Sequence, residues 1–352
     1  MAASLQEVQA NLGATLTTMA EMTVPATFGN DAAAIAATQS AVALYDRSHW
    51  GRILVSDGDR LRFLHNQTTN AFEGRKPGEG CDTVFVNSTA RTLDLATAYV
   101  LEAAVLLLVS PHRRQFLLQW MDRFIFFADK VKLQDITPAT AAFSLIGPES
   151  RAIAEHLGAA DLLDQPDGTH RTYTVNGATV RIAVGSGLAL PGFTLIADAV
   201  HAADLWTALV AAGAIPLGET AWEQLRIIQG RPAPDHELTE DFNPLEAGLW
   251  HTISLSKGCY IGQETIARLH TYRGVKQQLW GVKLAAGVPP GSPLTADGER
   301  VGILTSCTPT SQGYRGLAYL RTKAIAAGVT HVQAEGIDGE LVSLPFVRHE
   351  YI

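Results

Sequence analysis

The sequence predicts an α+β fold in which two related α+β units precede a small antiparallel β-barrel. Two neighbouring stretches, approximately residues 48–136 and 137–225, each alternate strand patterns with helix patterns. From residue 276 to residue 352, short strand patterns are separated by Gly and Pro, which is typical of a small barrel or sandwich. We therefore predict a region 1–275 that contains both units, with shared flanking segments, and a C-terminal domain 276–352.

In the first unit and the segment before it, apolar residues at helical spacing indicate helices, and short β-branched or continuously apolar runs indicate strands. Residues 57–67 are typical, because Ser56 or Asp57 can accept hydrogen bonds from the amides of the first helical turn. The predicted helices are 33–45, 57–67 and 112–126, and the predicted strands are 52–56, 83–87, 94–101, 104–110 and 131–136.

The second unit repeats this alternation. Its clearest feature is the Asn176-Gly177 pair within residues 171–184, because Asn-Gly favours the two-residue turn of a β-hairpin. The other predicted strands are 141–147 and 193–197, and the predicted helices are 149–158 and 198–213. In the C-terminal domain, strands are predicted within LWGVKLA, ERVGILTS, GLAYL, HVQAE and ELVSLPF.

Composition excludes several classes of protein. The formal net charge of -8 argues against a protein that coats nucleic acid through bulk charge, so no direct nucleic-acid binding is expected. The cysteines (Cys81, Cys259 and Cys307) lie far apart without a CxxC motif, which predicts neither a disulfide framework nor a zinc site. The most apolar stretch, residues 98–110, is too short to span a bilayer, and no secretory signal is apparent, so a cytoplasmic protein without a membrane partner is expected.

The segment KGCYIGQE, residues 257–264, carries the strongest chemical signal. Its glycines permit a tight turn around Cys259, and in an extended chain Lys257 would point to the same side as Cys259. A nearby ammonium favours the thiolate, which is the nucleophilic form of cysteine. The alternative is a buried, inert cysteine in a glycine turn. Further along, Glu264 and Arg268 have the spacing of an ion pair on a helix.

KGCYIGQE, followed by Ala267-Arg268, resembles the KGCYxGQE signature of the YgfZ proteins in the glycine-cleavage T-protein (GcvT) superfamily. Three other segments resemble the superfamily: GDRLRFLHNQTTNAF (58–72), LRIIQGRPAPDHELTEDFNPLEAGL (225–249) and VGILTSCTPTSQGYRGLAYL (301–320). The resemblance implies a ring of two interleaved ferredoxin-like domains and a β-barrel. It also implies that tetrahydrofolate, or a one-carbon derivative, binds in the central channel.

The resemblance also implies roles for residues outside the signature. Asp94 lies where T-proteins place the aspartate that faces the reactive folate nitrogen, where a carboxylate can stabilise a developing cation or relay a proton. Arg226 matches a T-protein arginine and suits a folate carboxylate by bidentate geometry, although a buried ion pair is an alternative. Within the signature, Tyr260, Gln263, Glu264 and Arg268 are expected to contact the cofactor. Tyr260, like Trp250, could instead fill the core.

This chain departs from the T-protein pattern at two places. The segment that corresponds to the pterin-binding GYTGE motif is SGLALPGFTLI (186–196), which contains no acid, and Trp222 replaces one arginine. No metal site is expected, because the three histidines nearest to Cys259 in sequence lack ligand spacing: His236, His251 and His270. The basic residues Lys257, Arg268, Arg273 and Lys276 could meet a polyglutamate tail, an acidic partner or RNA, or form a solvated face.

Three functions follow as hypotheses. The first is a folate-binding factor that supports iron–sulfur cluster assembly or repair, and through it radical enzymes that modify tRNA. The second is a folate-dependent aminomethyl- or methyltransferase of the T-protein type. The third is a binding scaffold without turnover. The cysteine in KGCYIGQE and the missing acid at 186–196 favour the first.

Overall fold

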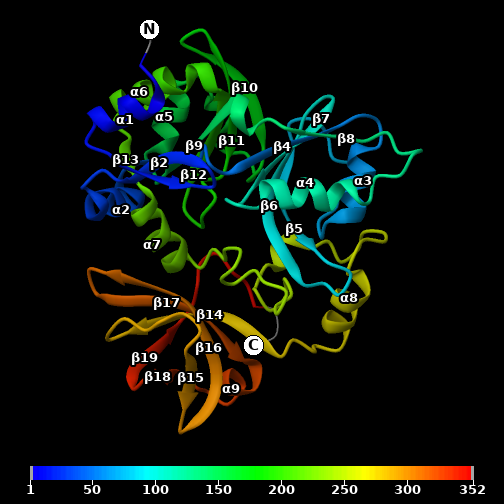
Figure 1. The fold of residues 1–352 in the computed structure, drawn as a ribbon, viewed down its shortest axis with the longest axis vertical. Helices are drawn as coiled ribbons and strands as arrows, with labels where there is room; N and C mark the ends of the chain where they lie inside the picture. Colours follow the sequence, from blue (N-terminus) through cyan, green and yellow to red (C-terminus); the bar gives the residue numbers. More distant parts are fainter. Residues whose placement is uncertain (1–2, 350–352) are drawn as a thin grey trace. The chain divides into compact units, whose positions relative to one another are not determined.

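The structure, a computed structural model, describes residues 3–349 and groups them into two compact units (Figure 1). The first unit comprises residues 1–63, 72–81 and 96–222, and the second comprises residues 64–71, 82–95 and 223–352. Among the residues described, no helix is both long enough and apolar enough to cross a bilayer. The boundary that the sequence predicts near residue 275 stays a prediction.

The first unit contains a six-stranded sheet whose strand order is β10-β11-β12-β9-β3-β13. Its pairs are antiparallel except β13 with β3, which are parallel. The predicted hairpin at Asn176-Gly177 is confirmed: both residues have positive φ (50° and 83°), as a tight turn of this kind requires. The strands are β10 (His170–Val175), β11 (Ala178–Val184), β12 (Gly192–Asp198), β9 (Thr140–Ile146), β3 (Ala43–Asp46) and β13 (Ile215–Leu217).

Helices pack on this sheet through apolar side chains. Trp206 and Leu209 of one helix and Ile153 of another join Phe143 and Leu195 of the sheet in a buried core. The helix predicted at 33–45 is shorter than expected, because the chain turns at residue 41 and continues as strand β3. The helices are α1 (Leu5–Asn11), α2 (Asp31–Ser40), α5 (Ser150–His156) and α6 (Ala202–Ala211), and a hairpin of β1 (Thr15–Met19) and β2 (Met22–Thr27) precedes α2.

A five-stranded sheet has the order β5-β6-β7-β4-β8. Every residue of β7 is buried, which explains its continuously apolar sequence AVLLLV. The strands are β4 (Gly51–Ser56), β5 (Gly80–Val86), β6 (Thr92–Val100), β7 (Ala104–Val109) and β8 (Lys132–Asp135), with helices α3 (Arg60–Gln67) and α4 (Arg114–Asp122). Helix α3 begins later than the predicted residue 57, because Asp57 has φ of 80° and is not helical.

The second unit contains a closed barrel with the order β14-β17-β16-β15-β18-β19 and only antiparallel pairs, as the sequence predicts. Alternating apolar residues such as Val282, Leu304 and Leu320 fill its core. Strands β16 and β17 are longer than the predicted segments, because they continue to the turn between Thr310 and Gly313. The strands are β14 (Gln277–Leu284), β15 (Pro293–Ala296), β16 (Glu299–Thr310), β17 (Gly313–Arg321), β18 (His331–Ala334) and β19 (Ile337–Val342), with helix α9 (Thr322–Ala326).

Candidate functional site

Cys259 lies on an irregular loop of the second unit, residues 253–262, between a short 3-10 turn (Trp250–Thr252) and helix α8 (Gln263–Thr271). Main-chain hydrogen bonds join this loop to residues 65–70 at the end of α3, a segment that also belongs to the second unit. The amide of Ser254 donates to the Thr69 carbonyl at 3.0 Å, and the amide of Ile261 donates to the Asn66 carbonyl at 3.0 Å. The loop is therefore held at both ends.

Residues 65–70 are themselves held in place. The Thr69 hydroxyl donates to the Thr252 carbonyl at 2.8 Å and accepts from the Val84 amide of β5 at 3.0 Å. The Asn70 side-chain amide donates to the Asp82 carbonyl at 2.8 Å. Two segments that the sequence analysis identified separately, 58–72 and 257–264, thus meet in one substructure.

Lys257 is the central anchor of this substructure. Its Nζ atom donates to the carbonyl oxygens of His65, Thr68 and Asn70 at 2.5, 2.6 and 2.7 Å, and it lies 4.4 Å from the centre of the Tyr260 ring. Carbonyl groups at a helix end have no partner within the helix, so a cation is favourable there. The three ammonium protons point to main-chain oxygens, which gives Lys257 a structural role that the sequence analysis missed.

Two glycines shape the loop around the cysteine. Gly262 has φ of 81° and precedes α8, and a Cβ atom there would lie 2.9 Å from the Asn87 carbonyl oxygen and 3.0 Å from Ala90 Cα. Any other residue would therefore be strained by both its backbone conformation and its contacts. A Cβ atom on Gly258 would lie 3.9 Å from Nε2 of His65, so an imidazole borders the loop beside Cys259.

The Cys259 side chain is exposed, whereas Cys81 and Cys307 are only partly so. The alternative of a buried, inert cysteine at 259 therefore does not describe this site. An exposed thiol on a loop with fixed ends can meet a ligand or a partner without rearrangement of the fold. The chemistry that Cys259 performs stays a prediction.

Tyr260 points the other way, into the core. It is 9% exposed and packs with Trp250, Ile266 and Leu245, and this burial raises the pKa of its hydroxyl to about 12. Its contact with the Lys257 ammonium adds a cation–π interaction. The geometry favours the core-filling alternative for Tyr260 and Trp250 over stacking on a pterin.

The other residues expected to bind the cofactor from this segment lie on α8. Gln263 is half-buried at the first position of the helix, and Glu264 and Arg268 are exposed one turn apart. The structure thus places them directly after the Cys259 loop with their side chains accessible. Gln263, Glu264 and Arg268 can meet a ligand without giving up a core contact.

Arg226 lies in α7 (Glu219–Gln229) and is 2% exposed. Its guanidinium donates to Glu237 at 2.8 Å, to Glu223 at 2.9 Å and to the Ser306 hydroxyl at 2.8 Å. Burial by itself lowers the pKa of the guanidinium, but the two carboxylates outweigh it and raise the pKa. Glu237 also accepts from Thr305 at 2.7 Å. This geometry favours the buried ion pair, which was the alternative to a folate contact.

Asp94 is fully buried within β6 (0% exposed), among strand residues such as Leu93 and Leu95 that are also buried. It is therefore not an ordinary acid at a solvent-exposed strand edge. The structure brings together Lys257, Cys259, Gln263, Glu264 and Arg268 along one continuous segment. Asp94 and Arg226 lie in separate buried environments of the same unit, and the roles assigned to them stay predictions.

The segment 186–196, which lacks the expected acid, contacts a buried arginine of the first unit instead. A Cβ atom on Gly187, which has φ of 87°, would lie 2.8 Å from Nη1 of Arg47. The neighbouring Ser186 is fully buried and donates to the Leu190 carbonyl at 2.7 Å. A glycine at 187 is thus required by the close approach of the guanidinium.

The sequence analysis missed this buried cationic and aromatic cluster of the first unit. The Arg47 guanidinium lies 3.9 Å from the ring centre of Trp50 and 5.8 Å from that of Trp222, which stacks on Tyr45 at 4.3 Å. The signal was present, because polar and aromatic residues alternate in DRSHW, residues 46–50, between two strands. Trp222, noted only as a substitution for an arginine, proves to be a stacking partner.

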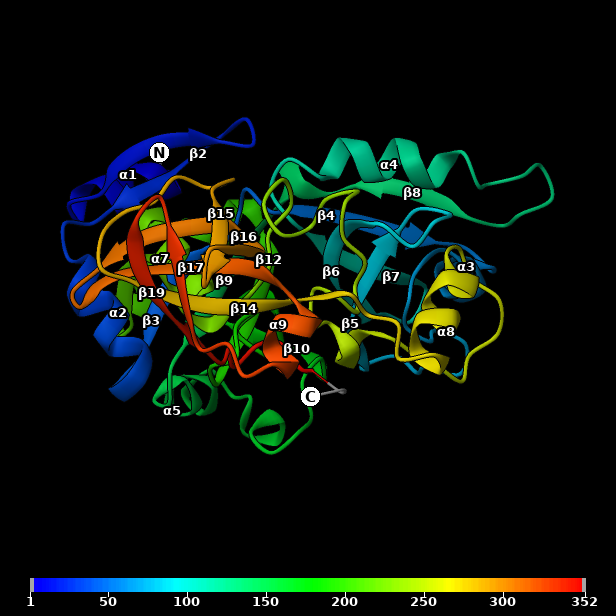
Figure 2. The same ribbon diagram turned by 90° about the horizontal axis from the view of Figure 1, so that it is seen from below.

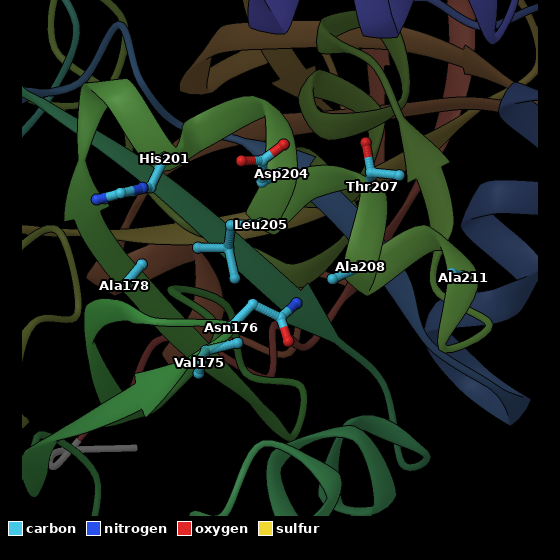
Figure 3. Close-up of a pocket in the computed structure, with 9 residues that line it drawn as sticks. All are labelled: Val175, Asn176, Ala178, His201, Asp204, Leu205, Thr207, Ala208 and Ala211. Atoms are coloured by element: carbon cyan, nitrogen blue, oxygen red, sulfur yellow. The ribbon is translucent and has the colours of Figure 1, made fainter. Parts of the chain in front are cut away.

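A surface pocket of about 360 Å³ lies elsewhere in the first unit, between the β10–β11 turn and α6 (Figure 3). Its lining contains none of the predicted site residues; the residues are Val175, Asn176, Ala178, His201, Asp204, Leu205, Thr207, Ala208 and Ala211. Within residues 3–349, no group of three or more His, Cys, Asp or Glu side chains is arranged to hold a metal ion.

Comparison with known proteins extends these observations. Residues 5–257 match the GCVT N-terminal domain, and residues 277–344 match the CAF17 C-terminal beta-barrel domain. A chloroplastic protein of Arabidopsis thaliana that is named as a candidate transferase is 48% identical over 326 residues, which cover 92% of this chain and 76% of that protein. The aminomethyltransferase of Geobacillus kaustophilus is 29% identical over 89% of each chain.

The aminomethyltransferase of Thermus thermophilus is 28% identical over 97% of this chain and 98% of its own length. The crystal structure of the glycine cleavage system aminomethyltransferase T from Bartonella henselae shows the same fold. Its TM-score is 0.84 at 20% sequence identity, over 99% of this chain and 98% of that one. The chain therefore belongs to the GCVT superfamily, and it combines the GCVT domain with a β-barrel of the CAF17 type.

Proposed function

We propose that this protein binds a reduced folate and supports the assembly or repair of iron–sulfur clusters, with Cys259 as its working thiol. The observation that carries the proposal is the placement of Cys259. It is exposed, on a loop whose ends are hydrogen-bonded to residues 65–70 and whose centre is anchored by Lys257. The CAF17-type barrel and the match of the signature segment to YgfZ proteins support the same role.

The fixed loop has a physical rationale. Ordering an irregular surface loop costs conformational entropy, and here hydrogen bonds from Lys257, Ser254 and Ile261 offset that cost. None of these three contacts buries the thiol, so the hydrogen bonds hold the loop while Cys259 stays accessible. Such an arrangement suits a residue that meets iron, sulfur or a reactive partner more than a residue that packs a core.

The fit of a folate to the predicted contacts is partial. Arg226 is already engaged by Glu223 and Glu237, so it is a poor partner for a second carboxylate. Arg268 is exposed and keeps its charge accessible, and we assign it the folate glutamate carboxylate, with Gln263 and Glu264 as hydrogen-bonding partners. When bound, the folate would supply one-carbon chemistry or a redox-sensitive ring, whereas the chain would bind and orient it.

A second function is favoured by the relatives named as aminomethyltransferases. In this alternative the protein transfers an aminomethyl or methyl group with folate as the acceptor or donor, as the names of relatives at 28–29% identity suggest. The absence of an acid in residues 186–196 and the contact of Gly187 with Arg47 argue against it, because that segment is built differently from the T-protein pattern.

The partners and location follow from the same proposal. Iron–sulfur proteins, including those that modify tRNA, are the proposed clients, and the cytoplasm is the proposed compartment. The wide separation of the cysteines in sequence agrees with a reducing environment.

The test combines a binding measurement with a functional one. Titration with tetrahydrofolate should raise the melting temperature of the wild type and of Cys259→Ala alike. In cells that lack the gene, wild type should restore the activity of iron–sulfur enzymes, whereas Cys259→Ala should not, and Cys81→Ala is the matched control. Full restoration by Cys259→Ala contradicts the role of the thiol. Consumption of methylenetetrahydrofolate with an amine, without any effect on iron–sulfur enzymes, supports the transferase instead.

A further inference from the structure

The loop between α4 and β8 presents two aromatic side chains to solvent. Phe126 is 70% exposed and Phe127 is 109% exposed, so the Phe127 ring has almost no contact with the rest of the chain. Both ribbon views show this loop extending beyond the ends of α4 and β8 (Figures 1 and 2). The adjacent residues Phe124 and Ile125 are half-buried, so the apolar run FIFF continues from the fold into solvent.

The loop is ordered by its own hydrogen bonds. The amide of Phe126 donates to the Asp129 carboxylate at 2.8 Å, and the amide of Asp129 donates back to the Phe126 carbonyl at 2.9 Å. The amide of Lys130 donates to the Asp59 carboxylate at 2.9 Å, and the Asp59 amide donates to the Lys130 carbonyl at 2.9 Å. The two rings are therefore held outward by a built turn.

The charges beside the rings are arranged with a net positive balance. Arg123 and Lys130 flank the run and are exposed, with Asp122 as the exposed acid next to them. The acids that hold the turn face inward: Asp59 and Asp129 accept from backbone amides and lie 3.3 and 3.6 Å from the Arg62 guanidinium. The tip thus combines apolar rings with two flanking cations whose stems can lie along an apolar surface.

We propose that this loop, centred on Phe126 and Phe127, makes a reversible contact with the interface of a phospholipid bilayer. A projecting aromatic tip needs no complementary pocket in a bilayer, and flanking Arg and Lys side chains complement anionic headgroups. Two rings without a long apolar helix provide one weak anchor, so the contact is transient. This proposal revises the expectation from the sequence that the protein meets no membrane, and it is independent of the chemistry proposed for Cys259.

The experiment is co-sedimentation of the full chain with sonicated vesicles. One set consists of phosphatidylcholine alone and the other of phosphatidylcholine mixed with phosphatidylglycerol. Wild type should bind both, more strongly with phosphatidylglycerol, and Phe126→Ser/Phe127→Ser should lose binding by about tenfold or more, since each ring no longer enters the interface. Val200→Ser is the matched control, because Val200 is 83% exposed elsewhere in the same unit.

Each remaining outcome has a defined meaning. Arg123→Ala/Lys130→Ala should lose only the preference for phosphatidylglycerol, because it leaves the rings in place. Unchanged melting temperatures show that these surface variants fold. Wild type that sediments with neither vesicle, or a double Phe variant that binds like wild type, overturns the proposal. A concentration-dependent dimer in sedimentation velocity that the double Phe variant abolishes, without vesicle binding, assigns the loop to a second copy of the chain and also overturns it.

Discussion

The Nζ atom of Lys257 donates a hydrogen bond of 2.7 Å to the carbonyl oxygen of Asn70, a residue 187 positions earlier in the chain. This contact joins the loop that carries Cys259 to the turn that follows α3. Lys257 thereby acts on the thiol through the position of the loop. The structure assigns its charge to main-chain carbonyls at the end of a helix.

Replacing Lys257 by methionine should loosen the loop. Methionine keeps the apolar stem but donates no hydrogen bond, so three carbonyl groups lose a charged partner. We expect the free energy of unfolding to fall by about 2–3 kcal/mol. Urea denaturation measures this loss, and hydrogen exchange should show faster exchange of the Ser254 and Ile261 amides. Lys276→Met, at an exposed position, is the control and should change neither quantity.

Replacing Arg226 by alanine should destabilise the second unit. The change leaves Glu237, which is 0% exposed, as an uncompensated buried carboxylate. Breaking a buried pair by removal of one partner costs about 3–5 kcal/mol. The double variant Arg226→Ala/Glu237→Gln should regain part of this loss, and Glu223→Ala should cost less because Glu223 is half-exposed. A weaker affinity for tetrahydrofolate with unchanged stability contradicts the ion-pair interpretation of Arg226.

Cys259 should be the first cysteine to react with iodoacetamide. It is exposed in the folded protein, whereas Cys81 and Cys307 are partly covered, so access favours Cys259. Mass spectrometry of peptides after brief labelling measures the order of reaction. In concentrated urea the three rates should converge, because the fold no longer restricts access. Labelling of Cys81 or Cys307 at least as fast as Cys259 in the native protein contradicts this prediction.

Stability should decrease with acid through His170. Burial lowers the pKa of His170 to about 4, and Arg181, which only donates, places its Nη1 atom 2.8 Å from Nδ1, so the native imidazole is neutral. The unfolded histidine titrates near its ordinary value of about 6.5. Between these values the unfolded state binds more protons, so the contribution is complete above the unfolded pKa and is lost as the pH falls toward 4.

The expected loss from His170 alone is roughly 3 kcal/mol, as an order of magnitude. Urea denaturation at several pH values between 4 and 7 measures it. In His170→Asn the side-chain oxygen can still accept from Arg181, and the dependence on pH in this range should be shallower. His156→Asn, at an exposed position, should keep the wild-type dependence. Equal slopes for wild type and His170→Asn contradict the prediction.

The elements of regular structure were largely predictable because their signals are local. The Asn176-Gly177 turn, the apolar run of β7 and the short strands of the barrel each follow from neighbouring residues, since side chains repeat with fixed periods in strands and helices. Boundaries were less predictable. The helix predicted at 33–45 ends at Ser40, because residues 43–46 find a partner strand in β9, about 100 residues later.

By itself, the sequence determined the α+β fold, the C-terminal barrel and the segment 257–264 as the place of an accessible cysteine. Only the tertiary structure decided which partners the charged side chains have. Lys257 pairs with carbonyls of residues 65–70, and Arg226 pairs with Glu237 and Ser306. The physical reason is that a buried charge must be matched by whatever groups the fold brings within hydrogen-bond distance, and those groups are distant in the chain.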